Sequence, residues 1–354
     1  MYQHVEVRIA QIAPLAEPVP PDRYGGTERV VSYLADELVR RGHQVTLFAS
    51  GDSQTEANVV PVTDRSLRRD PAATEPVAPH VRELGMAFGS ADDFDIIHSH
   101  VDYLAFPAAR LSCTPTVHTL HGRLDPPHLA PLFAEFTDLS LVSISKAQRE
   151  PLRALNLNWV ATVHHGIAVE EFPFSPRVGT YLAFVGRMSP EKRPDLAIEI
   201  AKRAGLPLKI AAKLDDTNSE YFEGEIRPRL DHGLVEFCGE LDEDSKRRLM
   251  AGARALLFPI DWPEPFGLVM IEAMATGTPV IARPCGAVPE VLASGRTGFI
   301  ADSMEELVAA AKRADTLDRT ACRRHVEDRF SVSRMVDDYE ALYRRLSGSF
   351  APAV

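Results

Sequence analysis

The sequence predicts an α/β protein with two tandem, doubly wound, Rossmann-like domains. Short apolar runs alternate with longer amphipathic stretches, the alternation stops once near the middle of the chain, and it then resumes. Runs that are apolar throughout are typical of strands in a parallel sheet covered on both faces. The length of 354 residues also exceeds the size at which a single core usually stops growing.

The first half of the chain carries one strand–helix series. An apolar run at 7–14 predicts the first strand, and an amphipathic pattern at 27–43 predicts a helix that ends at Gly42. Further strands are expected at 44–50, 94–100, 114–122, 138–145 and 159–166. The segment 52–80 is rich in Pro, Thr, Asp and Ala and is interpreted as a variable excursion without regular periodicity.

A linker and a second series follow. Proline, glycine and acidic residues at 166–180 indicate the linker, and a periodic segment at 332–348 indicates a terminal helix. The strands of the second series are expected at 181–187, 207–213, 234–240, 255–260 and 278–283. We therefore predict an N-terminal domain at 1–165 and a C-terminal domain at 181–331. Ligands of such sheets bind at the carboxyl ends of the strands, so two facing domains would form a cleft there.

Composition narrows the class of protein. The net charge of −11 argues against broad, nonspecific nucleic-acid binding. Four widely spaced cysteines without a CxxC pair indicate buried thiols in a reducing compartment. The first residues show no signal-peptide pattern, and no apolar run approaches the roughly 18 to 20 residues that span a bilayer. We expect a cytoplasmic protein, and a peripheral membrane contact stays open.

Gly25 and Gly26 lie between the loop after the first strand and the first helix. Two glycines allow a ligand to approach the backbone closely, and a helix N-terminus favours an anion. Taken alone, such a pair before a helix is more often a simple turn. Because the chain contains neither GxGxxG nor GxxxxGK[ST], the dinucleotide and P-loop interpretations lose their main support.

Arg187, Lys192 and Arg193 flank the turn after the first strand of the second domain. Cations are unfavourable near a helix N-terminus. The position of Arg187 and Lys192 at a strand's carboxyl end suits a bound diphosphate. Arg193 is interpreted as a solvated residue at the helix start.

Histidines and acidic pairs were weighed as metal ligands. Six histidines fall near predicted strand ends of the first domain, at His98, His100, His118, His121, His164 and His165. None has the spacing of a zinc site. His121, followed by Gly122, is best placed to face a cleft, whereas His118 is interpreted as structural. The DxD patterns at 93–95 and 242–244 are interpreted as a strand approach and a helix cap, so no metal site is expected.

The stretch PEPFGLVMIEAMATGTPV at 263–280 holds two glutamates. Glu264 follows the predicted strand at 255–260 and stands just before an apolar helix that carries Glu272. A loop charge and a surface charge are the simplest interpretation. The position at a strand's carboxyl end, beside helix N–H groups that can face phosphate, favours a ligand site instead.

Taken together, these motifs resemble a retaining, nucleotide-sugar-dependent glycosyltransferase of family 4 with the GT-B fold. The N-terminal part carries YGGTERVVSYLADELVRRGHQVTLFA and DIIHSH, and the C-terminal part carries FVGRMSPEKRPDLAIEIAK, the E-x7-E stretch with its PFG insert, and GRTGFI. The resemblance covers nearly the whole chain. It implies that the terminal helix, 332–354, crosses back to the first domain.

The resemblance also implies roles for the donor-binding residues. Glu264 matches the acid that binds the hydroxyls of the donor sugar, and Glu272 the acid that binds the ribose. Helical spacing gives a separation of about 12 Å along the axis, at 1.5 Å per residue, which suits the two ends of a nucleotide-sugar. The backbone N–H groups of Phe266, Gly267 and Leu268 would face the sugar and diphosphate.

Other roles implied by the resemblance lie on both domains. Arg187 and Lys192 match the pair that neutralises the diphosphate, Gly25 and Gly26 would approach it, and His121 matches a histidine near the reacting edge of the sugar. Where many relatives have a glycine, this chain has AAKLDD, so a nucleotide contact by Lys213 is a hypothesis. The acceptor regions at 52–80 and 122–136 match nothing specific.

The expected activity is transfer from a UDP-sugar, or a GDP- or ADP-sugar, to an unidentified acceptor that is a saccharide, a lipid-linked group or a small molecule. Neither a metal ion nor another cofactor is expected, since cations and helix N-termini can stabilise the leaving diphosphate. By analogy with the family, configuration is retained through a front-face attack. The alternatives are a nucleotide-sugar epimerase of the same fold and a non-catalytic nucleotide-sugar-binding protein.

Overall fold

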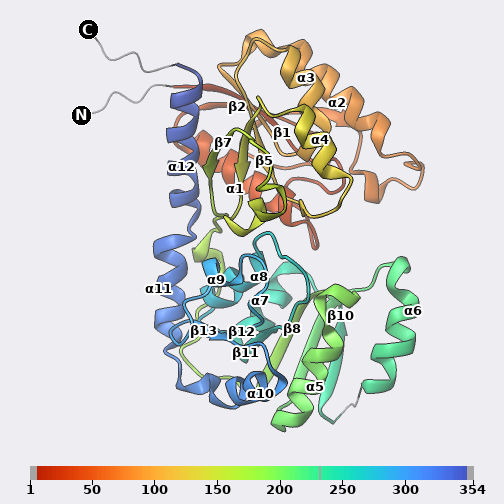
Figure 1. Cartoon of the computed structure of the whole chain (residues 1–354), viewed down its shortest axis with the longest axis vertical. Helices are drawn as coiled ribbons and strands as arrows, with labels where there is room; N and C mark the ends of the chain where they lie inside the picture. Colours follow the sequence, from red (N-terminus) through yellow and green to blue (C-terminus); the bar gives the residue numbers. More distant parts are fainter. Residues whose placement is uncertain (1–5, 231–232, 349–354) are drawn as a thin grey trace. The chain divides into compact units, whose positions relative to one another are not determined.

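The computed structural model describes residues 6–230 and 233–348. The chain divides into two compact units (Figure 1). Unit 1 comprises the residues up to Gly166 and those from Val332 onward, and unit 2 comprises Ile167–Ser331. Each unit contains one parallel sheet with helices, so the predicted pair of doubly wound α/β sheets is confirmed.

The sheet of unit 1 has seven strands in the order β3-β2-β1-β4-β5-β6-β7. Its strands are β1 (Arg8–Ile12), β2 (Gln44–Ser50), β3 (Asn58–Thr63), β4 (Ile96–Ser99), β5 (Thr116–Leu120), β6 (Ser140–Ser143) and β7 (Trp159–Thr162). Its helices are α1 (Gly26–Arg40), α2 (Val77–Gly89), α3 (Phe106–Leu111), α4 (Leu129–Glu135) and α12 (Val332–Leu346). The order reverses between β1 and β4, which makes their carboxyl ends the switch point.

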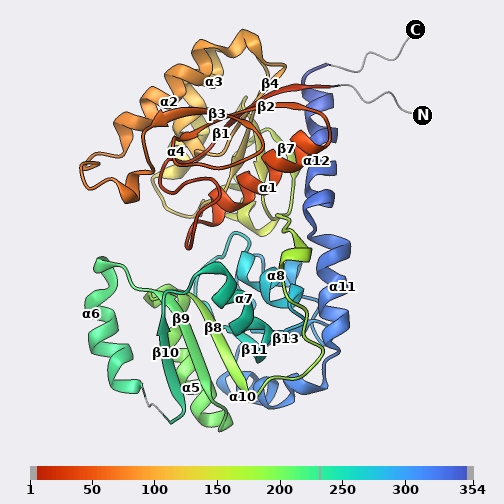
Figure 2. The ribbon, with the colours of Figure 1, turned by 180° about the vertical axis from the view of Figure 1, so that it is seen from behind.

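The sheet of unit 2 has six strands in the order β10-β9-β8-β11-β12-β13 (Figure 2). Its strands are β8 (Tyr181–Arg187), β9 (Leu208–Lys213), β10 (Val235–Gly239), β11 (Ala253–Phe258), β12 (Val280–Ala282) and β13 (Gly298–Ile300). Its helices are α5 (Pro194–Ala204), α6 (Ser219–Tyr221), α7 (Glu243–Ala251), α8 (Leu268–Ala275), α9 (Val288–Val291), α10 (Met304–Arg313) and α11 (Arg319–Arg329). The switch point lies between β8 and β11.

The helix boundaries follow from local chemistry. Gly205 ends α5 in the left-handed conformation, at φ +69°, which glycine adopts without strain. Ser303 and Glu306 form a capping box that begins α10 by satisfying exposed backbone N–H groups. Asp242 begins α7 by accepting a hydrogen bond from the backbone N–H of Ser245, which confirms that this DxD pattern is a helix cap.

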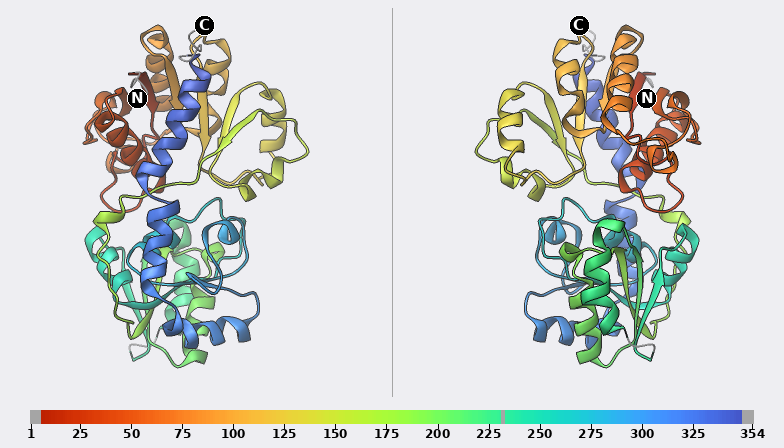
Figure 3. Two further views of the ribbon diagram at one scale, coloured as in Figure 1. Left: turned by 90° about the vertical axis from the view of Figure 1, so that its left-hand side faces the viewer. Right: turned by 90° about the vertical axis from the view of Figure 1, so that its right-hand side faces the viewer.

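The terminal helix α12 belongs to unit 1 and packs against α1 (Figures 2 and 3). Arg41, at the end of α1, forms ion pairs with Asp337 at 2.6 Å and with Glu340 at 3.3 Å. The ring of His43 also contacts Glu340 at 2.9 Å. The buried face of α12 includes Tyr339 and Tyr343, and positions 349–354 of the predicted segment lie outside the described residues.

The interpretation of 52–80 as an irregular excursion is wrong in two places. Residues 58–63 form β3, the edge strand of the sheet, and α2 begins at Val77. β3 is mostly exposed or half-buried and contains Pro61, so its composition resembles that of a loop. β13 was also not predicted, because three residues give no readable period. Within the described part of the chain, no helix is long and apolar enough to cross a bilayer.

Candidate active site

The carboxyl ends of β8 and β11 meet at the switch point of the unit 2 sheet, because these two strands pair directly. β8 ends at Arg187 and β11 ends at Phe258. The connection after β8 carries Lys192, and the connection after β11 carries Glu264. The fold therefore places these predicted residues at the position where ligands bind in open α/β sheets.

Lys192 and Glu264 form a close ion pair. Nζ of Lys192 donates to Oε2 of Glu264 at 2.5 Å, and Nε1 of Trp262 donates to the same oxygen at 2.9 Å. The ammonium also lies 4.4 Å from the centre of the Trp262 ring, a cation–π contact. The side chains of Lys192 and Glu264 are 16% and 10% exposed, so the pair is largely desolvated. Oε1 of Glu264 accepts no hydrogen bond within residues 6–230 and 233–348 and can accept one from a ligand hydroxyl.

Gly286, in the loop after β12, fixes the backbone of Glu264. The N–H of Ala287 donates to the carbonyl oxygen of Glu264 at 2.9 Å. A Cβ atom on Gly286 would lie 2.2 Å from that oxygen and 2.3 Å from the Glu264 nitrogen. Gly286 also has φ +56°, so both space and conformation require glycine here.

The N-terminus of α8 lies directly after this carboxylate. Gly267 precedes the helix with φ +86°, and a Cβ atom there would lie 2.7 Å from Cε of Met270. Phe266 is a core residue, 2% exposed, and its ring contacts that of Phe330. Its side chain therefore serves packing, and the predicted contribution of Phe266, Gly267 and Leu268 to a ligand is limited to the backbone. Free N–H groups at this end favour an anion.

Glu272 lies on α8 and is 5% exposed. Its Oε1 accepts from Nζ of Lys246 at 3.3 Å, and the same ammonium donates to Glu243 at 2.9 Å. The helical spacing used to predict a separation of about 12 Å from Glu264 does not hold over the whole segment, because α8 begins only at Leu268. Helical rise applies to the last four steps alone, about 6 Å at 1.5 Å per residue, and Pro265, Phe266 and Gly267 join Glu264 to the helix without helical structure.

Two hydrogen-bond donors near the end of β8 lack partners. Nε of Arg187 and Oγ of Ser189 are buried, and neither forms a hydrogen bond with the residues that the structure describes. The other end of the Arg187 guanidinium donates to Glu191 at 3.1 Å. An unsatisfied buried donor costs about 1–3 kcal/mol, so a ligand that accepts hydrogen bonds here removes a penalty.

The neighbouring cations are paired. Lys213 stands beside Arg187 in the register of β8 and β9, and its Nζ lies 3.0 Å from Oδ1 of Asp215. Arg193 precedes α5 in the left-handed conformation and bridges Asp195 at 2.9 Å and Asp261 at 3.2 Å. The interpretation of Arg193 as a merely solvated residue is therefore wrong, because its two ion pairs link the first turn of α5 to the loop after β11.

In unit 1, Gly25 and Gly26 begin α1. Gly25 has φ +149°, and a Cβ atom there would lie 2.7 Å from Pro21 and 3.2 Å from the carboxylate of Glu28. Glu28 is buried, and burial raises its pKa to about 7. Gly25 thus brings the backbone close to the carboxyl group of Glu28, and Gly26 is the first residue of the helix.

His121 follows β5 in a polar network at the switch point of unit 1. Its backbone N–H donates to Oδ1 of Asp102 at 3.0 Å, and Asp102 itself has the unusual φ of 48°. Nε2 of His121 lies 2.9 Å from Nδ1 of His100, and the ring stacks on His165 with centroids 5.2 Å apart. Burial lowers the pKa of His121 to about 3, so the ring is neutral. Its buried Nδ1 has no hydrogen-bond partner in the described part of the chain.

The contacts of His118 and Asp95 indicate structural roles. His118 is fully buried against the ring of Phe106, which supports its structural interpretation. Asp95 pairs with Arg8 at 2.7 Å. Among residues 6–230 and 233–348, no group of three His, Cys, Asp or Glu side chains is arranged to hold a metal ion.

Sequence reasoning missed four residues that shape the two sites. Trp262 orients Glu264, Gly286 holds its backbone, Ser189 adds an unpaired donor, and Asp102 fixes the turn at His121. Trp262 and Ser189 stand within three positions of predicted residues, so proximity could have indicated them. Gly286 and Asp102 act across the fold, and no local pattern reveals such contacts.

Two family models match the chain in succession. The model described as Glycosyltransferase Family 4 matches residues 24–172, and the model described as Glycosyl transferases group 1 matches residues 172–325. Together they span residues 24–325, which include the loops that carry the predicted residues.

Curated relatives align over most of their length. The D-inositol 3-phosphate glycosyltransferase of Mycolicibacterium smegmatis is 27% identical over 402 residues, which cover 98% of this chain and 92% of the relative. A glycogen synthase of Mycobacterium tuberculosis is 26% identical, with 91% of this chain and 89% of the relative covered. These relatives use different substrates, so they leave donor and acceptor open.

Solved structures share the fold. AviGT4, a glycosyltransferase involved in avilamycin A biosynthesis, matches with a TM-score of 0.75 and 22% identity, covering 97% of this chain and 99% of that chain. Anabaena HepE, solved in complex with UDP and glucose, matches with a TM-score of 0.76 and 19% identity, covering 96% of this chain and 100% of that chain. The predicted GT-B class is therefore confirmed.

Proposed function

Because this chain belongs to glycosyltransferase family 4, we propose that it transfers a sugar from a UDP-sugar to an acceptor hydroxyl, with retention of configuration and without a metal ion. The observation that carries this proposal is the desolvated pair of Lys192 and Glu264 at the switch point of unit 2. A nucleotide-sugar offers both groups a new partner: a diphosphate for the ammonium and sugar hydroxyls for the carboxylate.

The donor is proposed to lie along the loop that joins β11 to α8. Glu264 accepts hydrogen bonds from the sugar through Oε1, the oxygen that neither Lys192 nor Trp262 uses. Glu272 binds the ribose hydroxyls. The N-terminus of α8, at Gly267 and Leu268, lies between the two carboxylates in the chain and suits the diphosphate.

The diphosphate is proposed to bind the donors at the end of β8. Arg187 and Ser189 each have a buried donor atom without a hydrogen-bond partner among the described residues, and phosphate oxygens accept such hydrogen bonds. Lys192 adds a charge once it turns from Glu264 to the phosphate. Lys213 is proposed to contact the nucleotide, which requires its ammonium to share or leave Asp215.

Unit 1 is proposed to contribute Gly25, Gly26 and His121 to substrate binding. Gly25 and Gly26 offer close backbone approach at the start of α1. His121 offers the neutral, unpartnered Nδ1 to a sugar hydroxyl.

The proposed mechanism follows the growth of negative charge. The bond between the anomeric carbon and the UDP oxygen breaks, and the charge on the diphosphate is stabilised by Arg187, Lys192 and the N-terminus of α8. The acceptor oxygen attacks from the same face and forms the new glycosidic bond. Its proton passes to the leaving phosphate oxygen, so the products are the glycoside and UDP.

The identity of the base is proposed from the relatives. HepE has been solved with UDP-glucose as well as with UDP and glucose. A panel of UDP-, GDP- and ADP-sugars, incubated with the protein in EDTA, tests the choice. We expect nucleotide release from a UDP-sugar and not from a GDP- or ADP-sugar. The rate of this release should increase when a panel of acceptors is added.

The same assay separates the alternatives. An epimerase would release nucleotide and an altered free sugar at a rate that acceptors do not change. A binding protein would raise its thermal midpoint with a donor, by mass action, without releasing nucleotide. Loss of the activity in EDTA would contradict metal independence.

A further inference from the structure

A chain of buried hydrogen bonds runs from the terminal helix to His121. Nε2 of His121 contacts Nδ1 of His100 at 2.9 Å, and Nε2 of His100 contacts Oε1 of Gln11 at 2.7 Å. Nε2 of Gln11 donates to the hydroxyl of Tyr343 at 3.2 Å. These residues lie on or directly after β1, β4 and β5, and on α12. Gln11 is the polar residue within the buried part of β1, Ile9–Ile12, and it is fully buried.

The polarity of this chain follows from what each atom can do. Oε1 of Gln11 can only accept, so Nε2 of His100 carries the proton. A neutral imidazole carries one proton, so Nδ1 of His100 is an acceptor, and Nε2 of His121 must donate to it. Burial lowers the pKa values of both rings, which keeps them neutral. Nδ1 of His121 is then left with a lone pair.

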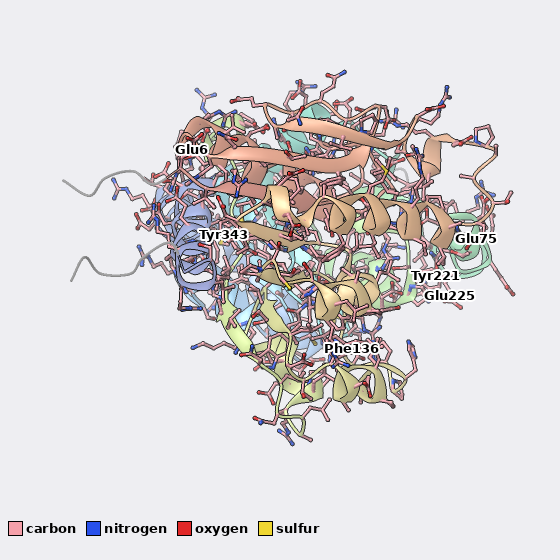
Figure 4. The ribbon with its side chains drawn as sticks, turned by 90° about the horizontal axis from the view of Figure 1, so that it is seen from above. Glu6, Glu75, Phe136, Tyr221, Glu225 and Tyr343 are labelled. Atoms are coloured by element: carbon pink, nitrogen blue, oxygen red, sulfur yellow. The ribbon has the colours of Figure 1, made fainter. Side chains whose placement is uncertain are left out.

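The hydroxyl of Tyr343 joins the Gln11 amide to His98. It accepts from Gln11 and lies 2.6 Å from Nδ1 of His98, to which it can donate. Nε2 of His98 is in turn 2.7 Å from Oγ1 of Thr119. Figure 4 marks Tyr343 on α12, where the side chain is fully buried. A hydroxyl can accept from Gln11 and donate to His98 at the same time, so both contacts are compatible with this direction along the chain.

We infer that Gln11, His100 and Tyr343 are positioning residues, which hold His121 in the Nε2–H tautomer and present its Nδ1 as a hydrogen-bond acceptor to a substrate hydroxyl. The identity of that substrate as a sugar rests on the proposed function, whereas the tautomer does not. The consequence for specificity is direct. A sugar that lacks the hydroxyl facing Nδ1 leaves a buried acceptor unpaired and is a poorer substrate.

Nitrogen NMR of the ligand-free protein, labelled at histidine, tests the tautomer without any substrate. His121→Asn identifies the signals of His121 by their disappearance. We expect Nε2 of His121 to carry the proton and Nδ1 to be unprotonated at neutral pH. A proton on Nδ1 would overturn the inference, since it requires the opposite direction of every bond in the chain.

Two variants test the cause of the tautomer, and a third is a matched control. Gln11→Leu and Tyr343→Phe should shift the His121 nitrogen signals toward those of a mixture of tautomers. Tyr339→Phe removes a hydroxyl from the same helix that contacts Thr119 at 2.9 Å and reaches Gln11 only through Thr119, His98 and Tyr343, so the His121 signals should shift less than in Gln11→Leu. Signals unchanged in both Gln11→Leu and Tyr343→Phe would overturn the inference. Tyr343→Phe keeps the test available if Gln11→Leu does not fold.

Donor turnover supplies the second readout. With a UDP-sugar and its single-deoxy analogues, we expect one deoxygenation to lower kcat/KM about tenfold in the wild type, the size of one lost hydrogen bond. Gln11→Leu should remove that discrimination, and Tyr339→Phe should keep it. Discrimination that survives in Gln11→Leu contradicts the inference. No turnover of any donor contradicts the proposed function instead, and the NMR result still stands.

Discussion

Lys192 and Glu264 neutralise each other in the ligand-free molecule, and the proposed chemistry requires them to separate. A desolvated pair is costly to break by removing one partner, because the other charge is left buried and alone. A diphosphate that replaces Glu264 beside Lys192 avoids this cost, since both groups gain new partners. Binding of the donor and release of the ion pair are therefore expected to occur together.

Replacing Lys192 by alanine should slow UDP release by about 10²–10³-fold, the range measured when one group that stabilises a developing charge is removed. The measurement is kcat for UDP release at a saturating UDP-sugar concentration. Lys209→Ala is the control, because its 3.4 Å pair with Glu236 is exposed and surface pairs contribute little. Equal rates in the Lys192 and Lys209 variants would contradict the assignment.

Trp262→Phe tests the orientation of Glu264. The variant keeps an aromatic ring beside Lys192 but removes the 2.9 Å hydrogen bond to Oε2 of Glu264. One neutral-to-charged hydrogen bond is worth about 1.5–3 kcal/mol, so we expect kcat/KM for the donor to fall roughly 10- to 100-fold. An unchanged kcat/KM would show that Lys192 and the backbone suffice to orient the carboxylate.

At the scale of elements, the loop after β12 supports the loop after β11. Gly286→Ala would drive a methyl group into the backbone of Glu264, which the loop can relieve only by moving that residue. We expect a loss of roughly 2–3 kcal/mol in the free energy of unfolding, from overpacking. Turnover should fall by more than about 10²-fold, because a displacement of 1 Å can cost that much.

Gly295→Ala is the matched control for Gly286→Ala. Gly295 has φ +79°, and no other atom lies within 4 Å of a Cβ built there. The substitution carries the conformational cost of about 1–2 kcal/mol without a clash. Turnover should remain at the wild-type level. Equal loss of turnover in both variants would contradict the role assigned to Gly286.

Much of the element structure could be predicted from the sequence, and the failures share a physical cause. The apolar run 181–187 and the strand β8 coincide, because a buried parallel strand needs apolar side chains on both faces. β3 was missed because an edge strand is half-exposed and tolerates Pro61. The helical spacing counted from Glu264 fails, because Gly267 in the left-handed conformation delays the start of α8 to Leu268.

The residues of the candidate site also fall into those that could be predicted from the sequence and those that could not. Glu264, Lys192 and Arg187 could be predicted, because their positions after strands place them at a binding edge. The contact of Gly286 with Glu264 and that of Gln11 with Tyr343 could not, because each joins segments far apart in the chain. Such contacts depend on the packed fold and leave no local period in the sequence.

At the scale of the whole molecule, Glu83 links stability to pH. This residue of α2 is fully buried, and its carboxyl oxygens have no hydrogen-bond partner in the described ranges. Burial raises its pKa well above the usual 4.5. The folded state therefore keeps a proton that the unfolded chain releases, and stability falls as pH rises from about 4.5 toward the folded-state pKa.

Glu83→Gln should remove this dependence. Relative to the wild type, the variant gains stability as pH rises through that window, by up to about 1.4 kcal/mol per pH unit. The measurement is the thermal midpoint at pH 5 and at pH 8. Glu75→Gln is the control, since hydrogen bonds from the backbone of Ala78 and Val77 lower the pKa of Glu75 below the usual 4.5, so this substitution should leave the change in thermal midpoint between pH 5 and pH 8 as in the wild type. If the thermal midpoints of the wild type and of Glu83→Gln change by the same amount between pH 5 and pH 8, the prediction is contradicted.

The central claim is that Glu264 binds the donor sugar in a family 4 glycosyltransferase that needs no metal ion. The most direct test compares the rates of UDP release from a UDP-sugar by the wild type and by Glu264→Gln, both in EDTA. The thermal midpoints of the two proteins are measured first, and they must be equal. We predict turnover by the wild type and a rate lower by at least about 10²-fold in the variant. A variant rate near that of the wild type, or a wild type that EDTA inactivates, would contradict the claim.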